Sequence, residues 1–357
     1  MDASLRRSAI RAGQEMEATL YDQNSDDDAV TTVSKAIESL AGIARNGTGK
    51  AAFEDAGEAL LSMLTRGRAP SVPTGLKALD RMSRMDRGAL TVLAGLTSMG
   101  KSALAVEIAR RVAAQGLRVR YFSLEMHSEQ IGARWVSAQM VERGGRLFPP
   151  AGIPYNKIAR HDELPLEAVD MIKAEGRNLP SVEIDPTQGL TVSEIIARAC
   201  DGETPDLVVV DYLNKVRKGD MGDLRHDLQV EAICNRLRDF AKDANCAVLL
   251  LSQLNRKKTD GETLVPTMDD LKDSSGIEQA ADTVWFVHRP AYHLEREAHR
   301  LDAAGESLDP EKREALNSLK PQMTVVVAKQ RQGQIGPVQL VANMAHNFVT
   351  DTDWGHR

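Results

Sequence analysis

The sequence lacks three features that would each indicate a class of protein: paired cysteines, long apolar runs and an excess of positive charge. Its three cysteines, Cys200, Cys234 and Cys246, are scattered and form no CxxC pair. We therefore expect buried thiols in a reducing compartment and no zinc site. No run approaches the roughly 18 apolar residues that cross a bilayer, and the first residues hold no apolar signal-peptide core. These absences predict a soluble, cytoplasmic protein with no membrane partner.

The charge balance is slightly acidic. Lys and Arg together number 45 and Asp and Glu together number 51, which gives a net charge of −6. This excludes a protein coated in basic surface but is compatible with a local basic channel. With 357 residues, the chain can bury one large core and a small second unit.

The most informative stretch is GLTSMGKS, residues 95–102, which we call the P-loop. It follows the apolar run 90–94 and precedes the helix-like run 103–109, which is the context that a phosphate-binding loop requires. Its glycines let backbone N–H groups turn toward phosphate oxygens, and the helix N-terminus adds partial positive charge there. The stretch predicts a nucleoside triphosphate site. The residues expected around the phosphates are Ser98, Met99, Gly100, Lys101 and Ser102.

From residue 71 on, short apolar runs alternate with helical patterns. The candidate strands are 90–94, 119–123, 207–211, 248–252, 283–287 and 324–328. Such runs separated by helices predict an α/β fold with a mainly parallel, doubly wound sheet and a ligand at the carboxyl ends of the strands. Residues 1–68 are interpreted as a short helical N-terminal region, and residues 69–357 as the domain that carries the nucleotide site.

Three polar side chains follow predicted strands at that edge of the sheet. Asp211 closes the run 207–211, where a carboxylate opposite the P-loop holds magnesium directly or through water. Glu125 follows an earlier strand and could polarise an attacking water. Gln253 follows a later strand, where its amide could sense the γ-phosphate by hydrogen bonding. A structural role at a strand end remains the alternative for each of them.

Several further segments resemble one family in the same order along the chain. They are PTGLKALDRM from Pro73, SLEMHSEQIGAR from Ser123, LVVVDYL from Leu207, LSQLNRK from Leu251, DLKDSSGIEQAADTVWFVHR from Asp270 and VVVAKQRQGQIGPVQL from Val325. Over residues 70–350 the chain resembles the ATPase domain of the DnaB family of replicative DNA helicases, superfamily 4 hexameric enzymes with a RecA-like P-loop NTPase core. SLEM, SQLNR, the SGIEQ segment and AKQR together are far more specific than a P-loop alone.

The resemblance implies a role for each matching residue. Lys101 and Ser102 match the family's phosphate and magnesium residues, and Asp211 matches the Walker B aspartate. Glu125 matches the catalytic glutamate, and Gln253 matches the sensor that links the γ-phosphate to DNA loops. ATP and Mg²⁺ are the implied cofactors.

The resemblance also implies cations that act on a neighbouring subunit. Lys329 and Arg331, in AKQRQG, match the lysine and the arginine finger that reach the neighbour's nucleotide. They follow the predicted strand 324–328 at spacing i and i+2, so we expect both to project from one side. An arginine acting in trans stabilises charge on the transferring phosphoryl group and makes hydrolysis depend on assembly.

A third set of implied residues concerns DNA. In the family, the loop matching 270–276 lines a central channel and touches the backbone of single-stranded DNA. The implied residues are Lys272, Asp273, Ser274, Ser275 and Gly276. Such contacts bind phosphates without reading sequence. The family commonly has Arg-Glu at Lys272 and Asp273, so the contacting atoms stay open. A second basic loop, 256–258, is more typical of solvated surface.

The expected assembly is a homo-hexamer. A site completed by the next subunit is a heterologous interface, which closes into a ring or continues as a filament. A helix at about 52–66 matches in position the family's linker helix, which docks on an adjacent subunit.

Two departures from the family affect the expected partners. Members carry an N-terminal domain that recruits primase and is too large to fit before residue 50, so primase binding does not follow from the resemblance. A helicase loader is a further partner that the resemblance allows. The segment 290–320 is a long, charged insert, which we expect to be an exposed helical excursion. A compact variant of this kind fits a phage-type member.

The resemblance therefore implies an ATP-dependent helicase that moves 5′ to 3′ on single-stranded DNA and unwinds forked duplex. A RecA-like recombinase or DNA-remodelling ATPase, which would form filaments without unwinding, is the alternative. A non-enzymatic ring is disfavoured because Lys101, Glu125, Asp211 and Arg331 are all present.

Overall fold

The computed structural model describes most of the chain from residue 70 onward. The described residues are 31–32, 34–35, 70–147, 152–160, 164–217, 225–254, 265–268, 270–271, 275–331 and 333–354. The proposed boundary at residue 68 and the linker helix at about 52–66 lie outside them. Within these ranges, no helix is long and apolar enough to cross a membrane.

A large mixed sheet organises the described part of the chain, with strand order β11-β10-β9-β8-β3-β7-β6-β4-β5. Its parallel strands are β3 (Leu90–Gly95), β4 (Val119–Ser123), β5 (Glu183–Asp185), β6 (Leu207–Asp211), β7 (Ala247–Gln253) and β8 (Thr283–His288). Its antiparallel strands are β9 (Gln322–Gln330), β10 (Gly336–Asn343) and β11 (Phe348–Asp351). The mainly parallel sheet is confirmed, and all six predicted strands are present.

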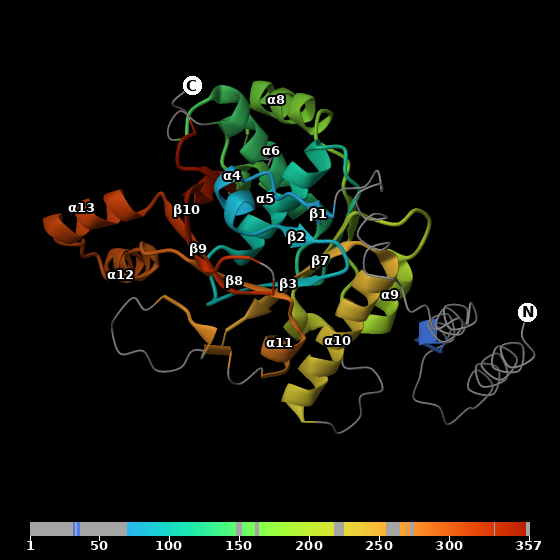
Figure 1. Cartoon of the computed structure of the whole chain (residues 1–357). Helices are drawn as coiled ribbons and strands as arrows, with labels where there is room; N and C mark the ends of the chain where they lie inside the picture. Colours follow the sequence, from blue (N-terminus) through green and yellow to red (C-terminus); the bar gives the residue numbers. More distant parts are fainter. Residues whose placement is uncertain are drawn as a thin grey trace, which may run out of the picture.

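Helices cover both faces of this sheet (Figure 1). One face carries α4 (Lys77–Met82), α5 (Lys101–Ala114) and α6 (Ser128–Gly144), and the other carries α9 (Val192–Ala199), α10 (His226–Ala244) and α11 (Ser275–Ala280). Two apolar clusters fill the spaces between sheet and helices, because alternate residues of each buried strand face opposite sides. The doubly wound arrangement is therefore confirmed.

Smaller elements surround this core. They are the two-stranded sheet of β1 (Ser71–Val72) and β2 (Met85–Asp86), the helices α7 (Tyr155–Ile158) and α8 (Leu166–Gly176) beside α6, and the short 3-10 helices Leu213–Lys215 and Met344–His346. The predicted insert forms α12 (Tyr292–Ala303) and α13 (Pro310–Leu319). Figure 1 shows α13 projecting beyond β9 and β10, and most of its residues are exposed, so the expected helical excursion is confirmed.

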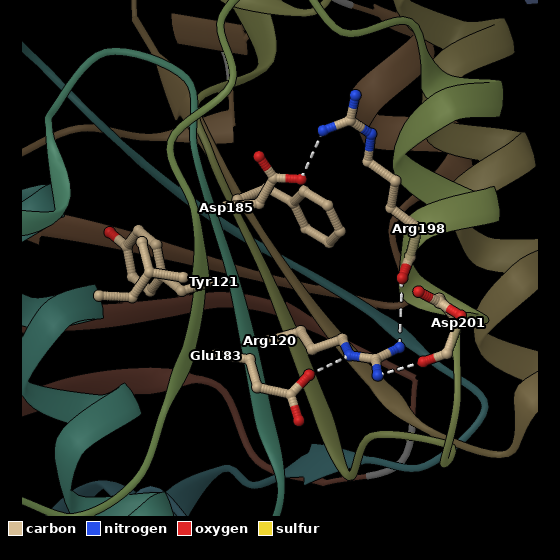
Figure 2. A pocket seen from close by; sticks show the side chains of 8 residues that line it. Arg120, Tyr121, Glu183, Asp185, Arg198 and Asp201 are labelled. Carbon is tan, nitrogen blue, oxygen red and sulfur yellow. Dashed lines mark hydrogen bonds and ion pairs between the residues drawn. The ribbon is translucent and has the colours of Figure 1, made fainter. Parts of the chain in front are cut away.

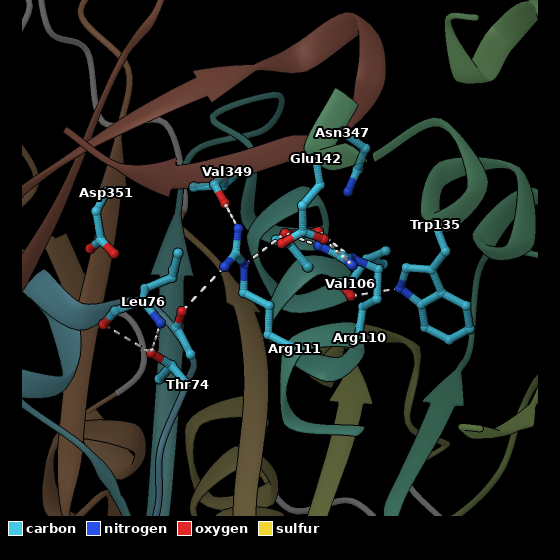
Figure 3. A network of polar contacts seen from close by, with 12 residues as sticks. Thr74, Leu76, Val106, Arg110, Arg111, Trp135, Glu142, Asn347, Val349 and Asp351 are labelled. Atoms are coloured by element: carbon cyan, nitrogen blue, oxygen red, sulfur yellow. Dashed lines mark hydrogen bonds and ion pairs between the residues drawn. The ribbon is translucent and has the colours of Figure 1, made fainter. Parts of the chain in front are cut away.

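A buried polar network fixes the helix that follows the P-loop (Figure 3). Glu107 of α5 is fully buried and accepts hydrogen bonds from Arg110 at 2.8 and 3.1 Å and from Arg111 at 2.7 Å. Arg111 Nη2 donates to the Val349 carbonyl of β11 at 2.9 Å, and Arg110 Nη1 pairs with Glu142 of α6 at 2.7 Å. These contacts join α5 to β11 and α6, so the N-terminus of α5 has a fixed direction.

One cysteine prediction is wrong. Cys234 and Cys246 are buried, as expected, but Cys200 is exposed, because it ends α9 at the edge of the sheet rather than continuing its buried face. Burial raises the pKa of the Cys234 thiol to about 12, which makes it unreactive at neutral pH.

Candidate active site

The P-loop lies between the end of β3 and the start of α5. Gly100 has φ 94°, and a Cβ at this position would lie 2.9 Å from the Met323 side chain, so only glycine fits without a shift. Ser98, the other residue with positive φ, has φ 66° and is exposed. The Met99 side chain is buried, and its N–H donates to the Leu96 carbonyl. The loop thus turns sharply and delivers Lys101 at the first turn of α5.

Lys101 is held inside the loop that it follows. Its Nζ donates to the carbonyl oxygens of Gly95 at 2.8 Å and Leu96 at 2.9 Å. Burial lowers the pKa of this amine to about 8, against the opposing effect of the Asp211 and Glu125 carboxylates. Phosphate oxygens bound beside this amine would raise its pKa again and keep it protonated.

Asp211, at the end of β6, is the most constrained acid of the site. It is almost fully buried, its Oδ1 accepts from the Ser102 hydroxyl at 3.2 Å, and its Oδ2 accepts from the Tyr121 hydroxyl at 2.8 Å. Burial raises the pKa of Asp211, while these two hydrogen bonds lower it and the nearby charge of Glu125 raises it further. The peptide bond from Asp211 to Tyr212 is cis.

Tyr121 is a site residue that sequence reasoning missed. It lies on β4, which pairs with β6, and its ring is fully buried. The sequence shows an apolar strand there, and only the pairing of β4 with β6 brings the hydroxyl to the carboxylate. No motif signals this contact.

Glu125 and Gln253 lie at the same edge of the sheet. Glu125 is exposed, two residues after β4, and its charge acts on the pKa of Lys101, Asp211 and Tyr212. Gln253 ends β7, and its Nε2 donates to Thr97 Oγ1 in the P-loop at 2.9 Å. The structure therefore brings together five predicted residues: Lys101, Ser102, Glu125, Asp211 and Gln253.

The donor set at this edge suits magnesium. Ser102 and Asp211 present one hydroxyl and one carboxylate within hydrogen-bond distance of each other. Mg²⁺ is typically bound by one or two protein oxygens together with phosphates and waters. In the described residues, no group of three or more His, Cys, Asp and Glu side chains forms a cage that could hold a metal by itself. The residues present fit a metal that is shared with a nucleotide.

Lys329 and Arg331 lie at the opposite edge of the sheet. β9 is antiparallel to β8, with Gln330 opposite Thr283, and Thr283 is opposite Thr91 near the start of β3. The P-loop follows the other end of β3. At about 3.3 Å per residue, the two edges are roughly 15 Å apart. A cation at the end of β9 is thus far from the P-loop of its own chain.

An irregularity in β9 directs Lys329. The register shifts between Val284 and Trp285, so that Ala328 has no partner and Lys329 lies opposite Val284. Such a bulge reverses which face the following residues occupy. Lys329 therefore faces α11, and its Nζ donates to the carbonyls of Glu278 at 2.5 Å and Ala281 at 2.8 Å. Arg331 Nε pairs with Asp282 Oδ1 at 3.1 Å. Both cations thus contact the connector between α11 and β8.

The predicted DNA loop falls largely outside the described residues. Lys272, Asp273 and Ser274 are not described, and Ser275 is described only as the first residue of α11. Gly276 packs against α10, where a Cβ would lie 2.3 Å from the Cβ of Glu231. This contact explains the glycine, and the DNA role of the loop stays a prediction.

A separate cavity of about 370 Å³ lies between β4, β5 and the end of α9 (Figure 2). Its charged side chains satisfy one another: Arg120 Nε donates to Glu183 at 2.6 Å, and Arg198 donates to Asp185 at 2.9 Å. Arg120 also donates to the carbonyl of Ala199 at 2.7 Å, which caps the end of α9. We interpret this cluster as structural.

Comparison with known proteins gives a consistent result. The model of the DnaB-like helicase C terminal domain matches residues 71–350. The curated Replicative DNA helicase DnaB of Rickettsia typhi is 29% identical over 366 residues, which cover 95% of this chain and 70% of that protein. The protein of the same name from Geobacillus stearothermophilus is 29% identical over 79% of this chain and 56% of its own length.

Solved structures share the fold. One solved ATPase domain superposes with a TM-score of 0.63 at 24% identity, covering 84% of this chain and 99% of that one. A DnaB-like replicative helicase, described together with its interactions with primase, superposes with a TM-score of 0.67 at 23% identity, covering 97% of this chain and 76% of that one. The RecA-like arrangement expected from the sequence is thereby confirmed.

Proposed function

Because the chain belongs to the family of the DnaB-like helicase C terminal domain, we propose that it is an ATP-hydrolysing replicative DNA helicase. It would act as a homo-hexameric ring, bind single-stranded DNA in its channel, move 5′ to 3′ and unwind duplex at a fork. The relatives named above carry the name of replicative DNA helicases. The proposal extends that activity to this chain and adds its direction and its assembly.

The observation that carries the proposal is the division of the cations between the two edges of the sheet. Lys101 lies beside Asp211 at one edge, and Arg331 lies at the other, beyond the end of β9. Arg331 is about half exposed and too far away to reach its own P-loop. If a second copy places its P-loop edge against this surface, Arg331 would reach the nucleotide site of that copy. Repetition of this heterologous contact gives a ring where the rotation between copies closes, which is the assembly proposed here, and a filament where it does not.

Each residue then has a distinct chemical task. The P-loop N–H groups and Lys101 would bind phosphate oxygens, and Ser102 and Asp211 would hold a magnesium ion, which would neutralise developing charge on the phosphates. Glu125, exposed and close to Asp211, orients the attacking water. Gln253 donates a hydrogen bond to Thr97 of the P-loop. It would sense whether the γ-phosphate is present and couple this to the position of the loop 270–276. Arg331 of the adjacent copy completes the site.

Strand displacement tests the proposal. Forked duplexes with a single 5′ or a single 3′ tail are incubated with ATP and Mg²⁺, and the wild type is compared with Arg331→Ala. We expect displacement from the 5′-tailed fork alone, and its loss in the variant. ATP turnover that DNA stimulates, without displacement from either fork, would overturn the helicase proposal. Electron microscopy of the ATP-bound protein separates rings from the extended filaments of a recombinase.

A further inference from the structure

The end of α11 and the connector to β8, residues 281–282, hold Lys329 and Arg331, the two cations proposed to act on the neighbouring subunit. Lys329 donates to the Glu278 and Ala281 carbonyls, and Arg331 contacts Asp282 through its backbone N–H at 3.2 Å as well as through its side chain. Lys329 is held by main-chain atoms, which no substitution removes. Asp282 contributes a carboxylate, which a substitution can alter.

Both oxygens of Asp282 have defined partners. Oδ2 accepts from the Leu90 N–H at 2.9 Å, at the first residue of the P-loop strand β3, and Oδ1 pairs with Arg331 Nε at 3.1 Å. The Asp282 side chain is 12% exposed, against 52% for Arg331. The Leu90 N–H thus fixes the carboxylate against the sheet, and the Arg331 side chain extends from the carboxylate toward solvent.

The way in which Asp282 contacts Arg331 matters for phosphate binding. A carboxylate that accepts from both Nη atoms would occupy the fork with which arginine binds phosphate. Here Asp282 pairs with Nε, and among the described residues it is the only side chain that forms an ion pair with this guanidinium. The contact restricts the direction of the arginine while its two Nη groups stay available.

We propose that Asp282 is a positioning residue that orients Arg331 toward the nucleotide of the neighbouring subunit. This inference rests on the proposed function, because it requires Arg331 to act in trans. As a positioning residue, Asp282 would act through Arg331 and would not itself touch nucleotide or metal. Its contribution is to restrict the orientations that the long, half-exposed side chain of Arg331 can adopt, so that the catalytic orientation is occupied more often.

Asp282→Asn tests the role with little change in shape. The amide oxygen can still accept from the Leu90 N–H, but the amide nitrogen is a donor and repels Arg331 Nε. We expect kcat for DNA-stimulated ATP hydrolysis to fall about tenfold to a hundredfold, because misplacing a catalytic group by about 1 Å has an effect of that size. KM for ATP should stay within about twofold, because the P-loop is unchanged.

Asp206 provides a matched control. Like Asp282, it joins an arginine to a backbone N–H, with Oδ1 on Arg87 at 2.7 Å and Oδ2 on the N–H of Arg118, directly before β4, at 2.7 Å, and its side chain is 16% exposed. Asp206→Asn should lower thermal stability at least as much as Asp282→Asn, because the Arg87 side chain is 4% exposed and that of Arg331 is 52% exposed. It should leave kcat unchanged.

Combination with Arg331→Ala separates positioning from a structural effect. If Asp282 acts through Arg331, the double variant has the kcat of Arg331→Ala alone. A kcat for Asp282→Asn equal to wild type, or a further loss of the same factor in the Arg331→Ala background, would overturn the inference. Normal kcat in Arg331→Ala itself would instead overturn the trans arginine of the proposed function.

Discussion

Lys101 combines a buried amine with two neighbouring acids, and this sets its protonation. Its pKa is lowered to about 8 chiefly by burial, so at pH 8 about half of the Lys101 amines are neutral, against less than about 1% for an ordinary lysine. We expect amine acylation, followed by peptide mass spectrometry, to label Lys101 with a midpoint near pH 8. Bound Mg²⁺ and ATP should suppress this labelling, because phosphate charge raises the pKa again.

Exposed lysines of the same digest serve as the internal reference. Labelling of Lys101 that rises only at the pH of those lysines, or that ATP leaves unchanged, would contradict the burial of the amine in the P-loop.

Tyr121 donates the hydrogen bond that satisfies Oδ2 of the buried Asp211 carboxylate. Tyr121→Phe leaves Oδ2 of Asp211 without this donor, which should lower the free energy of unfolding by about 1–3 kcal/mol. Tyr121 also lowers the pKa of Asp211, so its loss disfavours the carboxylate. We expect ATPase titrations to require more Mg²⁺ for half-maximal rate, increasingly so as pH falls.

Urea unfolding measures the stability change, with Tyr155→Phe as the control, because the ring of Tyr155 stacks on Arg134 outside the site. An unchanged Mg²⁺ requirement in Tyr121→Phe would show that Asp211 does not depend on this hydroxyl.

At the scale of single elements, β9 shows where sequence reasoning works and where it ends. Its apolar run 324–328 predicted a strand, and the structure confirms it. The sequence also placed both cations on one side by their spacing. It could not reveal the bulge at Ala328, which turns Lys329 toward α11, because the bulge depends on pairing with β8. Nor could it show that the end of β9 and the P-loop lie at opposite edges, which requires the strand directions.

The helix α5 depends on one buried carboxylate. Glu107 is fully buried and balances Arg110 and Arg111 on its own helix. Glu107→Gln would leave the guanidinium groups of Arg110 and Arg111, which are 4% and 14% exposed, with too little negative charge, and should cost about 3–5 kcal/mol of unfolding free energy. Glu142→Gln is the control: Glu142 is 39% exposed, so its loss should cost about 1 kcal/mol or less.

Urea unfolding monitored by circular dichroism compares the two variants. Equal losses for Glu107→Gln and Glu142→Gln would mean that the burial of Glu107 adds no stability beyond that of a partly exposed ion pair.

At the scale of the whole molecule, one half of the site was predictable and the other was not. Lys101 and Ser102 follow β3 through the P-loop, and Asp211 and Gln253 end two neighbouring parallel strands, so the rule that such strand ends converge brings the four residues together. Tyr121 reaches its partner from within a neighbouring strand, and no rule of spacing predicts such a contact. Residues that act between subunits follow even less from one chain, because their partners belong to another copy.

The surface beside Arg331 makes assembly testable apart from catalysis. Ile335 directly precedes β10, four positions after Arg331, and is 66% exposed. If Arg331 enters the neighbour's site, Ile335 lies near that interface, and its burial would contribute about 1.5–3 kcal/mol to association. Ile335→Glu should therefore raise, by about tenfold to a hundredfold, the protein concentration at which ATPase activity is half-maximal.

The ATPase rate at saturating protein concentration distinguishes weaker assembly from a loss of catalysis. At saturating protein concentration, Ile335→Glu should reach the wild-type kcat, whereas Arg331→Ala should stay low at every concentration. Ala315→Glu, which adds the same charge at an exposed position of α13, should leave the midpoint unchanged. A normal midpoint in Ile335→Glu, measured by ATPase titration and by sedimentation velocity, would place the subunit contact elsewhere. A lowered plateau would show instead that Ile335 takes part in setting the position of Arg331.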